Sequence, residues 1–225
     1  MSGQQTKQSG IETRRPIRAR NSGWVVRLAG VLCRMGVTPN AVSVSSVAFA
    51  LLGAAALVVQ SQTDPAVSAA LLLVAIACIG LRSLANLIDG MIAVEGGRGT
   101  PAGPLYNEFP DRVSDAAFFI AAGYAAPTLP ACVALGWSTA LLAVTTAYVR
   151  ALATSAGAPQ DFTGPMAKPH RMALLAIGCA ALAAEQFTTG TSYAMPITLG
   201  VIALGCVITI ARRLRRAARA LGARS

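Results

Sequence analysis

Six apolar segments, each close to the length that crosses a bilayer as a helix, constrain this chain more than any other feature. A membrane-spanning helix needs roughly 20 mostly apolar residues. The segments cover about 41–61, 66–94, 109–127, 129–154, 170–187 and 193–212. Only 12% of the residues are charged, about half the usual share in soluble domains. The sequence therefore predicts an all-α integral membrane protein with six transmembrane helices.

The two ends of the chain are polar and basic. Residues 1–22 lack the apolar core of a cleaved signal peptide, so they predict a disordered basic cytosolic tail. Residues 213–225 are Arg-rich and predict a second basic cytosolic tail. The membrane domain is therefore expected at 23–212.

A short amphipathic segment precedes the first apolar segment. Residues 23–35 alternate apolar side chains with Arg27 and Arg34, which favours a helix lying along the membrane surface. The GVTPN turn follows, with Asn40 as the candidate N-cap of the first span.

Basic residues fall on one side of the predicted spans. Six spans place both termini on the same side, and the connections near 62–65, 126–129 and 188–192 would face the other. Those three connections contain no Lys or Arg. By the positive-inside rule, both termini and the loops 95–108 and 155–169 are cytosolic.

The basic excess has two candidate partners. The net charge is +10, and both anionic lipid and nucleic acid attract such a chain. Arg-rich tails commonly end membrane spans, so we expect anionic lipid headgroups as the partner and no nucleic acid.

Five of the nine carboxylates gather in residues 86–115. They are Asp89, Glu95, Glu108, Asp111 and Asp115. This window lies at the cytosolic ends of the second and third spans. Ionisable groups inside a membrane cost several kcal/mol and mark a functional site by default.

Polar residues recur at helical spacing on both spans that flank this window. They are Arg82, Asn86 and Asp89 on the second span, and Asn107, Asp111 and Asp115 on the third. Each set shares one helix face, and the short Gly-rich loop between the spans would bring the two faces together. Clustered carboxylates need a neutralising cation, and oxygen ligands without His or Cys indicate Mg²⁺, Mn²⁺ or Ca²⁺.

The window resembles the signature of the CDP-alcohol phosphatidyltransferases, D-x2-D-G-x2-A-R-x8-G-x3-D-x3-D. The matching residues are Asp89, Gly90, Ala93, Gly103 and Asp111. The stretches GVTPNAVSVSS, YVRALA and GPMAKPHR resemble further segments of the family, so the similarity extends over most of the chain. The resemblance implies six spans, a homodimer, a bacterial inner (cytoplasmic) membrane location with the active site cytosolic, and two bound Mg²⁺ or Mn²⁺ ions.

The resemblance also implies a reaction. A phosphatidyl group would move from a CDP-activated lipid, most simply CDP-diacylglycerol, to an alcohol with release of CMP, as in phospholipid biosynthesis. The acceptor would be a phosphorylated polyol such as glycerol 3-phosphate or inositol phosphate, or else glycerol or phosphatidylglycerol.

The resemblance assigns roles to particular residues. Asp111 would be the catalytic base, with Asp115 as the alternative. The metal ligands would be Asn86, Asp89, Asn107, Asp111 and Asp115. Gly90, Ala93 and Gly103 would lie near the bound cytidine. Arg150, Lys168 and Arg171 would bind a substrate phosphate.

Three positions depart from the signature: Asn86 and Asn107 replace aspartates, and Val94 replaces the arginine. Asparagine offers a metal an oxygen without charge. Glu108 and Asp115 could restore carboxylates, with Glu95 a weaker candidate. The alternatives to an active enzyme are a catalytically inactive homologue and a cation-binding or transport protein on the same scaffold.

Some single residues have a second interpretation. Because Pro110 suits the first turn of a helix, Asn107 would be either an N-cap or a metal ligand. Arg82 would pair with a carboxylate more readily than contact substrate. Arg150 and Arg171 would either bind phosphate or extend toward the membrane surface at the ends of spans.

Overall fold

The computed structural model describes residues 22–95, 102–126 and 129–223, and within these ranges the chain forms helices and no strands. The helices are α2 (Gly23–Arg34), α3 (Pro39–Val59), the short 3₁₀ helix η2 (Gln60–Gln62), α4 (Pro65–Glu95), α5 (Gly103–Tyr124), α6 (Pro130–Ser155), α7 (Lys168–Thr188) and α8 (Ala194–Gly222). The predicted all-α fold is confirmed. Proline occupies the first turn of α3, α5, α6 and α7, where its missing N–H costs no hydrogen bond.

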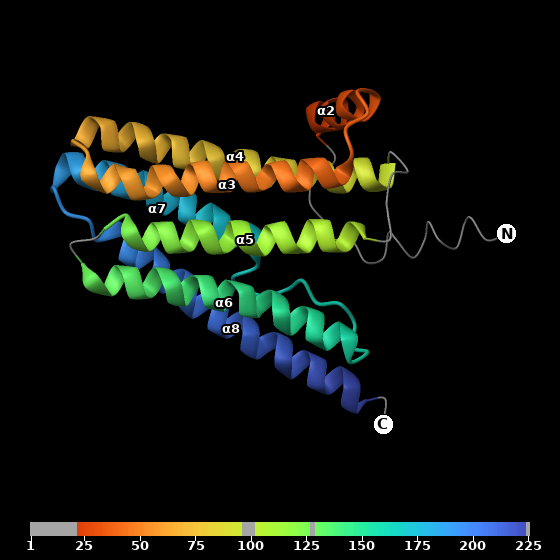
Figure 1. Cartoon of the computed structure of the whole chain (residues 1–225). Helices are drawn as coiled ribbons and strands as arrows, with labels where there is room; N and C mark the ends of the chain where they lie inside the picture. Colours follow the sequence, from red (N-terminus) through yellow and green to blue (C-terminus); the bar gives the residue numbers. More distant parts are fainter. Residues whose placement is uncertain (1–21, 96–101, 127–128, 224–225) are drawn as a thin grey trace.

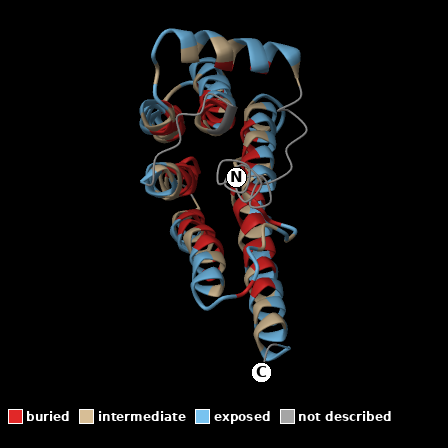
Figure 2. Ribbon diagram, turned by 90° about the vertical axis from the view of Figure 1, so that its right-hand side faces the viewer, coloured by how far each residue is buried: buried red, intermediate tan, exposed pale blue. Residues whose placement is uncertain are grey.

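The six long helices form a closed ring (Figure 1). α3 packs against α4 and α5, α5 against α6, α6 against α8, α8 against α7, and α7 against α4. Buried residues face one another between the helices (Figure 2). Small side chains let the helices approach closely: a Cβ on Gly136 of α6 would lie 2.7 Å from the Cα of Gly123 in α5.

The outer surface of the ring is apolar. Large apolar side chains on α3, α4, α6 and α8 are more than half exposed: Leu51, Leu73, Leu141, Ile197 and Leu204. Four helical segments are long and apolar enough to cross a membrane: Pro39–Gln62, Pro65–Ala93, Pro130–Ser155 and Ala194–Gly222. The protein is therefore a helical membrane protein.

Helix α2 lies outside the ring, beside one end of α3 and α4, and crosses the direction of the long helices (Figures 1 and 2). Its Val25 and Ala29 are buried against α4, whereas Trp24 and Val26 are exposed. The last turns of α4 and α6 and the first turns of α5 and α7 lie at this end (Figure 1). The end of α8 lies at the same end (Figure 1).

Two predicted helix starts were wrong, and one helix is longer than its predicted span. The N-cap of α3 is Thr38, whose hydroxyl accepts from the backbone N–H of Ala41 at 3.2 Å, and Asn40 lies inside the helix. Helix α5 begins at Gly103, so Asn107 is not an N-cap, and Pro110 lies within the helix. Helix α8 continues past the predicted span to Gly222, because its Arg-rich segment is made of good helix formers.

Candidate active site

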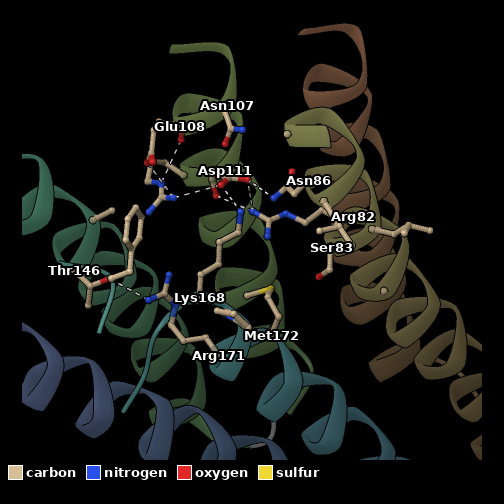
Figure 3. A pocket seen from close by; sticks show the side chains of 18 of the residues that line it. Arg82, Ser83, Asn86, Asn107, Glu108, Asp111, Thr146, Lys168, Arg171 and Met172 are labelled. Atoms are coloured by element: carbon tan, nitrogen blue, oxygen red, sulfur yellow. Dashed lines mark hydrogen bonds and ion pairs between the residues drawn. The ribbon is translucent and has the colours of Figure 1, made fainter. Parts of the chain in front are cut away.

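A cavity of about 590 Å³ opens between α4, α5, α6 and α7, next to the first turn of α2. Its wall is strongly basic. The basic residues that line it are Arg82, Arg112, Arg150, Lys168, Arg171 and Arg213. Glu108 and Asp111 are the acidic residues among its described lining (Figure 3).

The predicted facing of the two polar stripes is confirmed. Asn86 on α4 donates from Nδ2 to Asp111 Oδ1 on α5 at 2.5 Å, and Asn107 on α5 donates to Asp89 Oδ1 at 3.4 Å. Arg82 on α4 donates from Nη2 to Asp111 Oδ1 at 3.1 Å. Hydrogen bonds between side chains therefore connect the polar stripe of α4 with that of α5. Helices α4 and α5 are neighbours of α3 in the ring and face each other across the cavity.

Asp111 lies at the centre of the site (Figure 3). Besides Arg82 and Asn86, the ammonium group of Lys168 pairs with its Oδ2, and Arg112 approaches the same oxygen at 3.6 Å. The Asp111 side chain keeps some exposure to the cavity, which a proton-accepting group requires. Lys168 is the first residue of α7 and lies in the cavity wall.

Asp115 is a buried counter-ion in this structure. Its Oδ1 accepts from Arg82 at 2.8 Å and its Oδ2 from Arg171 at 2.8 Å, and its side chain is 1% exposed. The predicted pairing of Arg82 with a carboxylate is confirmed. Arg171 is 2% exposed, so its interpretation as a side chain extending to the membrane surface was wrong. Both carboxylate oxygens of Asp115 are thus engaged by arginines.

Asp89 differs from the other two aspartates because the described residues include no ion-pair partner for it. It is 2% exposed, and Ser43 donates to its Oδ2 at 2.5 Å. A buried carboxylate without a cation is costly, so this position calls for a positive charge. The structure thus adds Ser43, which helical spacing around the signature could not reveal because it lies on α3.

The residues fit one hard divalent cation better than two. Asp89, the side-chain oxygens of Asn86 and Asn107, and Asp111 form an all-oxygen donor set of the kind that Mg²⁺ and Mn²⁺ prefer. No group of three or more His, Cys, Asp or Glu that could hold a metal occurs among the described residues. A second ion at Asp115 does not fit the present arrangement, because that carboxylate is 1% exposed, lies between two buried guanidinium groups and is outside the described lining of the cavity.

The remaining predicted site residues are distributed around the cavity. Gly90 lines its wall, whereas Ala93 and Gly103 lie at the facing ends of α4 and α5, outside the described lining. The side chain of Glu95 lies outside the described part of the structure. Glu108 pairs with Arg150 at 2.5 Å.

Two wall residues were missed by sequence reasoning. Arg213 donates from Nε to the carbonyl of Thr163 at 3.0 Å and from Nη1 to the carbonyl of Thr146 at 2.6 Å. Phe162 places its ring 4.9 Å from the guanidinium carbon of Arg150. Arg213 belongs to the basic run after the last predicted span, and nothing in the spacing of that run distinguishes it from its exposed neighbours.

The fold is similar to that of known membrane enzymes. Two solved structures of Mycobacterium tuberculosis phosphatidylinositol phosphate synthase share the fold at 22% identity. The structure with CDP-DAG bound has a TM-score of 0.70 and covers 86% of this chain and 92% of that one. The structure in complex with manganese and citrate has a TM-score of 0.69 and covers 86% and 88%.

Sequence relatives carry the same name. The phosphatidylinositol phosphate synthase of Mycobacterium marinum is 29% identical over 198 residues, which cover 83% of this chain and 76% of that protein. The enzyme of that name from Mycobacteroides abscessus is 26% identical over 208 residues, covering 87% and 84%. No model of a protein family matches the chain. The resemblance to CDP-alcohol phosphatidyltransferases, predicted from the signature, is confirmed at low identity.

Proposed function

We propose that this protein is a metal-dependent phosphotransferase of phospholipid biosynthesis that moves a phosphatidyl group from CDP-diacylglycerol to an alcohol, with release of CMP. One observation carries the proposal: the two aspartates that match the family signature face each other's helix. Asp89 on α4 accepts a hydrogen bond from Asn107 on α5, and Asp111 on α5 accepts one from Asn86 on α4. Basic side chains surround them, as a pyrophosphate-bearing donor requires.

Asp89, Asn86, Asn107 and Asp111 would hold the metal. A bound Mg²⁺ or Mn²⁺ supplies neutralisation of the charge that develops on the phosphate oxygens. The two-metal arrangement of the family is the alternative to a single ion. For Asp115 to bind a second ion, one of its ion pairs, with Arg82 or with Arg171, would have to break.

Asp111 would take the proton of the acceptor hydroxyl as the attack on phosphorus proceeds. A base must be within hydrogen-bond reach of that proton; Asp111 lines the cavity, whereas Asp115 is 1% exposed and lies outside its described lining. Lys168 must move from Asp111 during the cycle, and the substrate phosphates would draw it away. Arg150 and Arg171 would hold phosphate oxygens from the other side of the cavity. Gly90, together with Ala93 and Gly103, would adjoin the cytidine.

The arrangement in the membrane follows from helix length. Helices α5 and α7 have 22 and 21 residues, about 33 and 31 Å at 1.5 Å per residue. That matches the roughly 30 Å hydrocarbon core, so we propose that they also span the bilayer, which makes six spans. The basic end, with both termini and the active site, would face the cytosol of a bacterium. Helix α2 would lie on the membrane surface, Arg-rich α8 would contact anionic lipid, and the protein would form a homodimer.

One observation favours the inactive-homologue alternative. Asn86 and Asn107 replace charged ligands, and the Lys168 ammonium group forms an ion pair with the Asp111 carboxylate. A homologue that had lost its metal would use such an internal cation permanently, whereas an enzyme would exchange it during turnover.

Release of CMP decides between the two. The purified full-length protein would be incubated with CDP-diacylglycerol, Mg²⁺ or Mn²⁺, and a panel of acceptors containing glycerol, inositol, their phosphates and phosphatidylglycerol. We expect CMP with at least one acceptor, and loss of release in Asp89→Ala and Asp111→Ala. Asp64→Asn, which keeps a helix-capping side chain at the opposite end of the ring, is the matched control and should retain activity. No CMP with any acceptor would contradict the enzyme proposal.

A further inference from the structure

Of the two carboxylates among the described residues of the cavity wall, Glu108 is by far the more exposed. Its Oε1 lies 2.5 Å from Arg150 Nη2, and its Oε2 lies 3.4 Å from Arg112 Nη2. The Glu108 side chain is 46% exposed, whereas the two arginines are 13% and 20% exposed. Glu108 thus bridges two guanidinium groups from the open side of the cavity (Figure 3).

Three other basic residues of the wall pair with more deeply buried carboxylates. Arg82 and Arg171 pair with the buried Asp115, and Lys168 pairs with Asp111. For Arg150 and Arg112, by contrast, the closest described carboxylate is that of Glu108, whose side chain is half exposed. They are therefore the guanidinium groups that an incoming anion reaches most easily.

A carboxylate and a phosphate bind a guanidinium group through the same donors, so they compete for it. Arg150 cannot easily turn to a second anion, because the ring of Phe162 lies 4.9 Å from its guanidinium carbon on another side. A phosphate monoester entering here would have to displace Glu108 and would then lie beside a like charge. Like charges brought together in a partly desolvated site repel strongly.

We propose that Glu108 determines which acceptor the site takes: its carboxylate occupies the position of an acceptor phosphate and selects an alcohol that carries no phosphate monoester. This inference rests on the proposed function and narrows its acceptor class. The uncharged hydroxyls of such an acceptor can donate to the Glu108 oxygens without displacing them, one helical turn from Asp111.

Binding of glycerol 3-phosphate tests the role of Glu108 without turnover. The full-length protein and the variants Glu108→Gln, Glu108→Ala, Arg150→Gln and Glu108→Gln/Arg150→Gln would be titrated calorimetrically with glycerol 3-phosphate, with CDP-diacylglycerol omitted. We expect Glu108→Gln to bind at least about fivefold more tightly than the wild type, since a repelling charge is removed and two guanidinium groups are released. The gain should be smaller in the double variant than in Glu108→Gln alone, because Arg150 is one of the two groups released.

Asp161→Asn is the matched control, because it removes another partly exposed carboxylate from the loop that holds Phe162. It should leave the affinity unchanged. Equal or weaker binding by both Glu108 variants overturns the inference, as does an equal gain in Asp161→Asn. Melting temperatures check that the variants fold. Absence of CMP release with every acceptor would refute the proposed function, whereas the titration by itself decides whether Glu108 excludes a phosphate.

Discussion

Replacing Asp115 by asparagine should destabilise the protein far more than replacing a cavity carboxylate. Asp115 neutralises Arg82 and Arg171, which are 0% and 2% exposed. Nε and Nη1 of Arg82 have no acceptor among the described residues, so that guanidinium depends on its contacts with α5. The variant leaves two buried charges under-compensated.

Removal of one partner from a buried ion pair costs about 3–5 kcal/mol. The lower end applies here, because Arg82 keeps Asp111 while Arg171 keeps the Thr146 hydroxyl and the Met166 carbonyl. For a chain of this size, about 3 kcal/mol corresponds to a fall in melting temperature of roughly 6–12 °C.

The assay is thermal unfolding of the detergent-purified protein, followed by circular dichroism. Glu108→Gln is the matched control, since it makes the same acid-to-amide change at a half-exposed pair worth about 1 kcal/mol or less. A melting temperature for Asp115→Asn no lower than that of the control would refute the counter-ion role and return Asp115 to consideration as a base or metal ligand.

Three further predictions concern the metal, the loop and the helix packing. Asn107→Asp should lower the Mn²⁺ concentration for half-maximal CMP release several-fold, because a charged ligand binds a hard cation more tightly; an unchanged or higher value would argue against this ligand. Arg213→Ala should speed amide exchange in the loop between α6 and α7, whose carbonyl it holds, whereas exposed Arg215→Ala should not; equal exchange in both would contradict the contact. Gly136→Ala should destabilise by about 1–3 kcal/mol in thermal melts, because its Cβ would meet the α5 backbone, whereas Gly200→Ala meets nothing; similar melting of the two would contradict the close packing.

The length and period of the apolar segments were sufficient to predict the helices. Each of the six predicted segments coincides with a helix in the structure, and the segment 23–35 forms α2. These are local properties: a long apolar run satisfies its backbone only as a helix in lipid, and residues four apart share a face wherever the helix is placed. For the same reason the spacing alone predicted that Asn86 and Asp111 would lie on facing stripes.

Only the tertiary structure decided which charge pairs with which. Arg171 reaches Asp115 from 56 residues away, and Ser43 reaches Asp89 from 46. Spacing along one helix carries no information about its rotation against a helix on the far side of the ring. That is why Asp115 was expected as a metal ligand and is found between two arginines. The three aspartates of the window 86–115 thus differ in their surroundings. Asp115 neutralises two buried arginines, Asp89 is buried without a described ion-pair partner, and Asp111 lines the cavity.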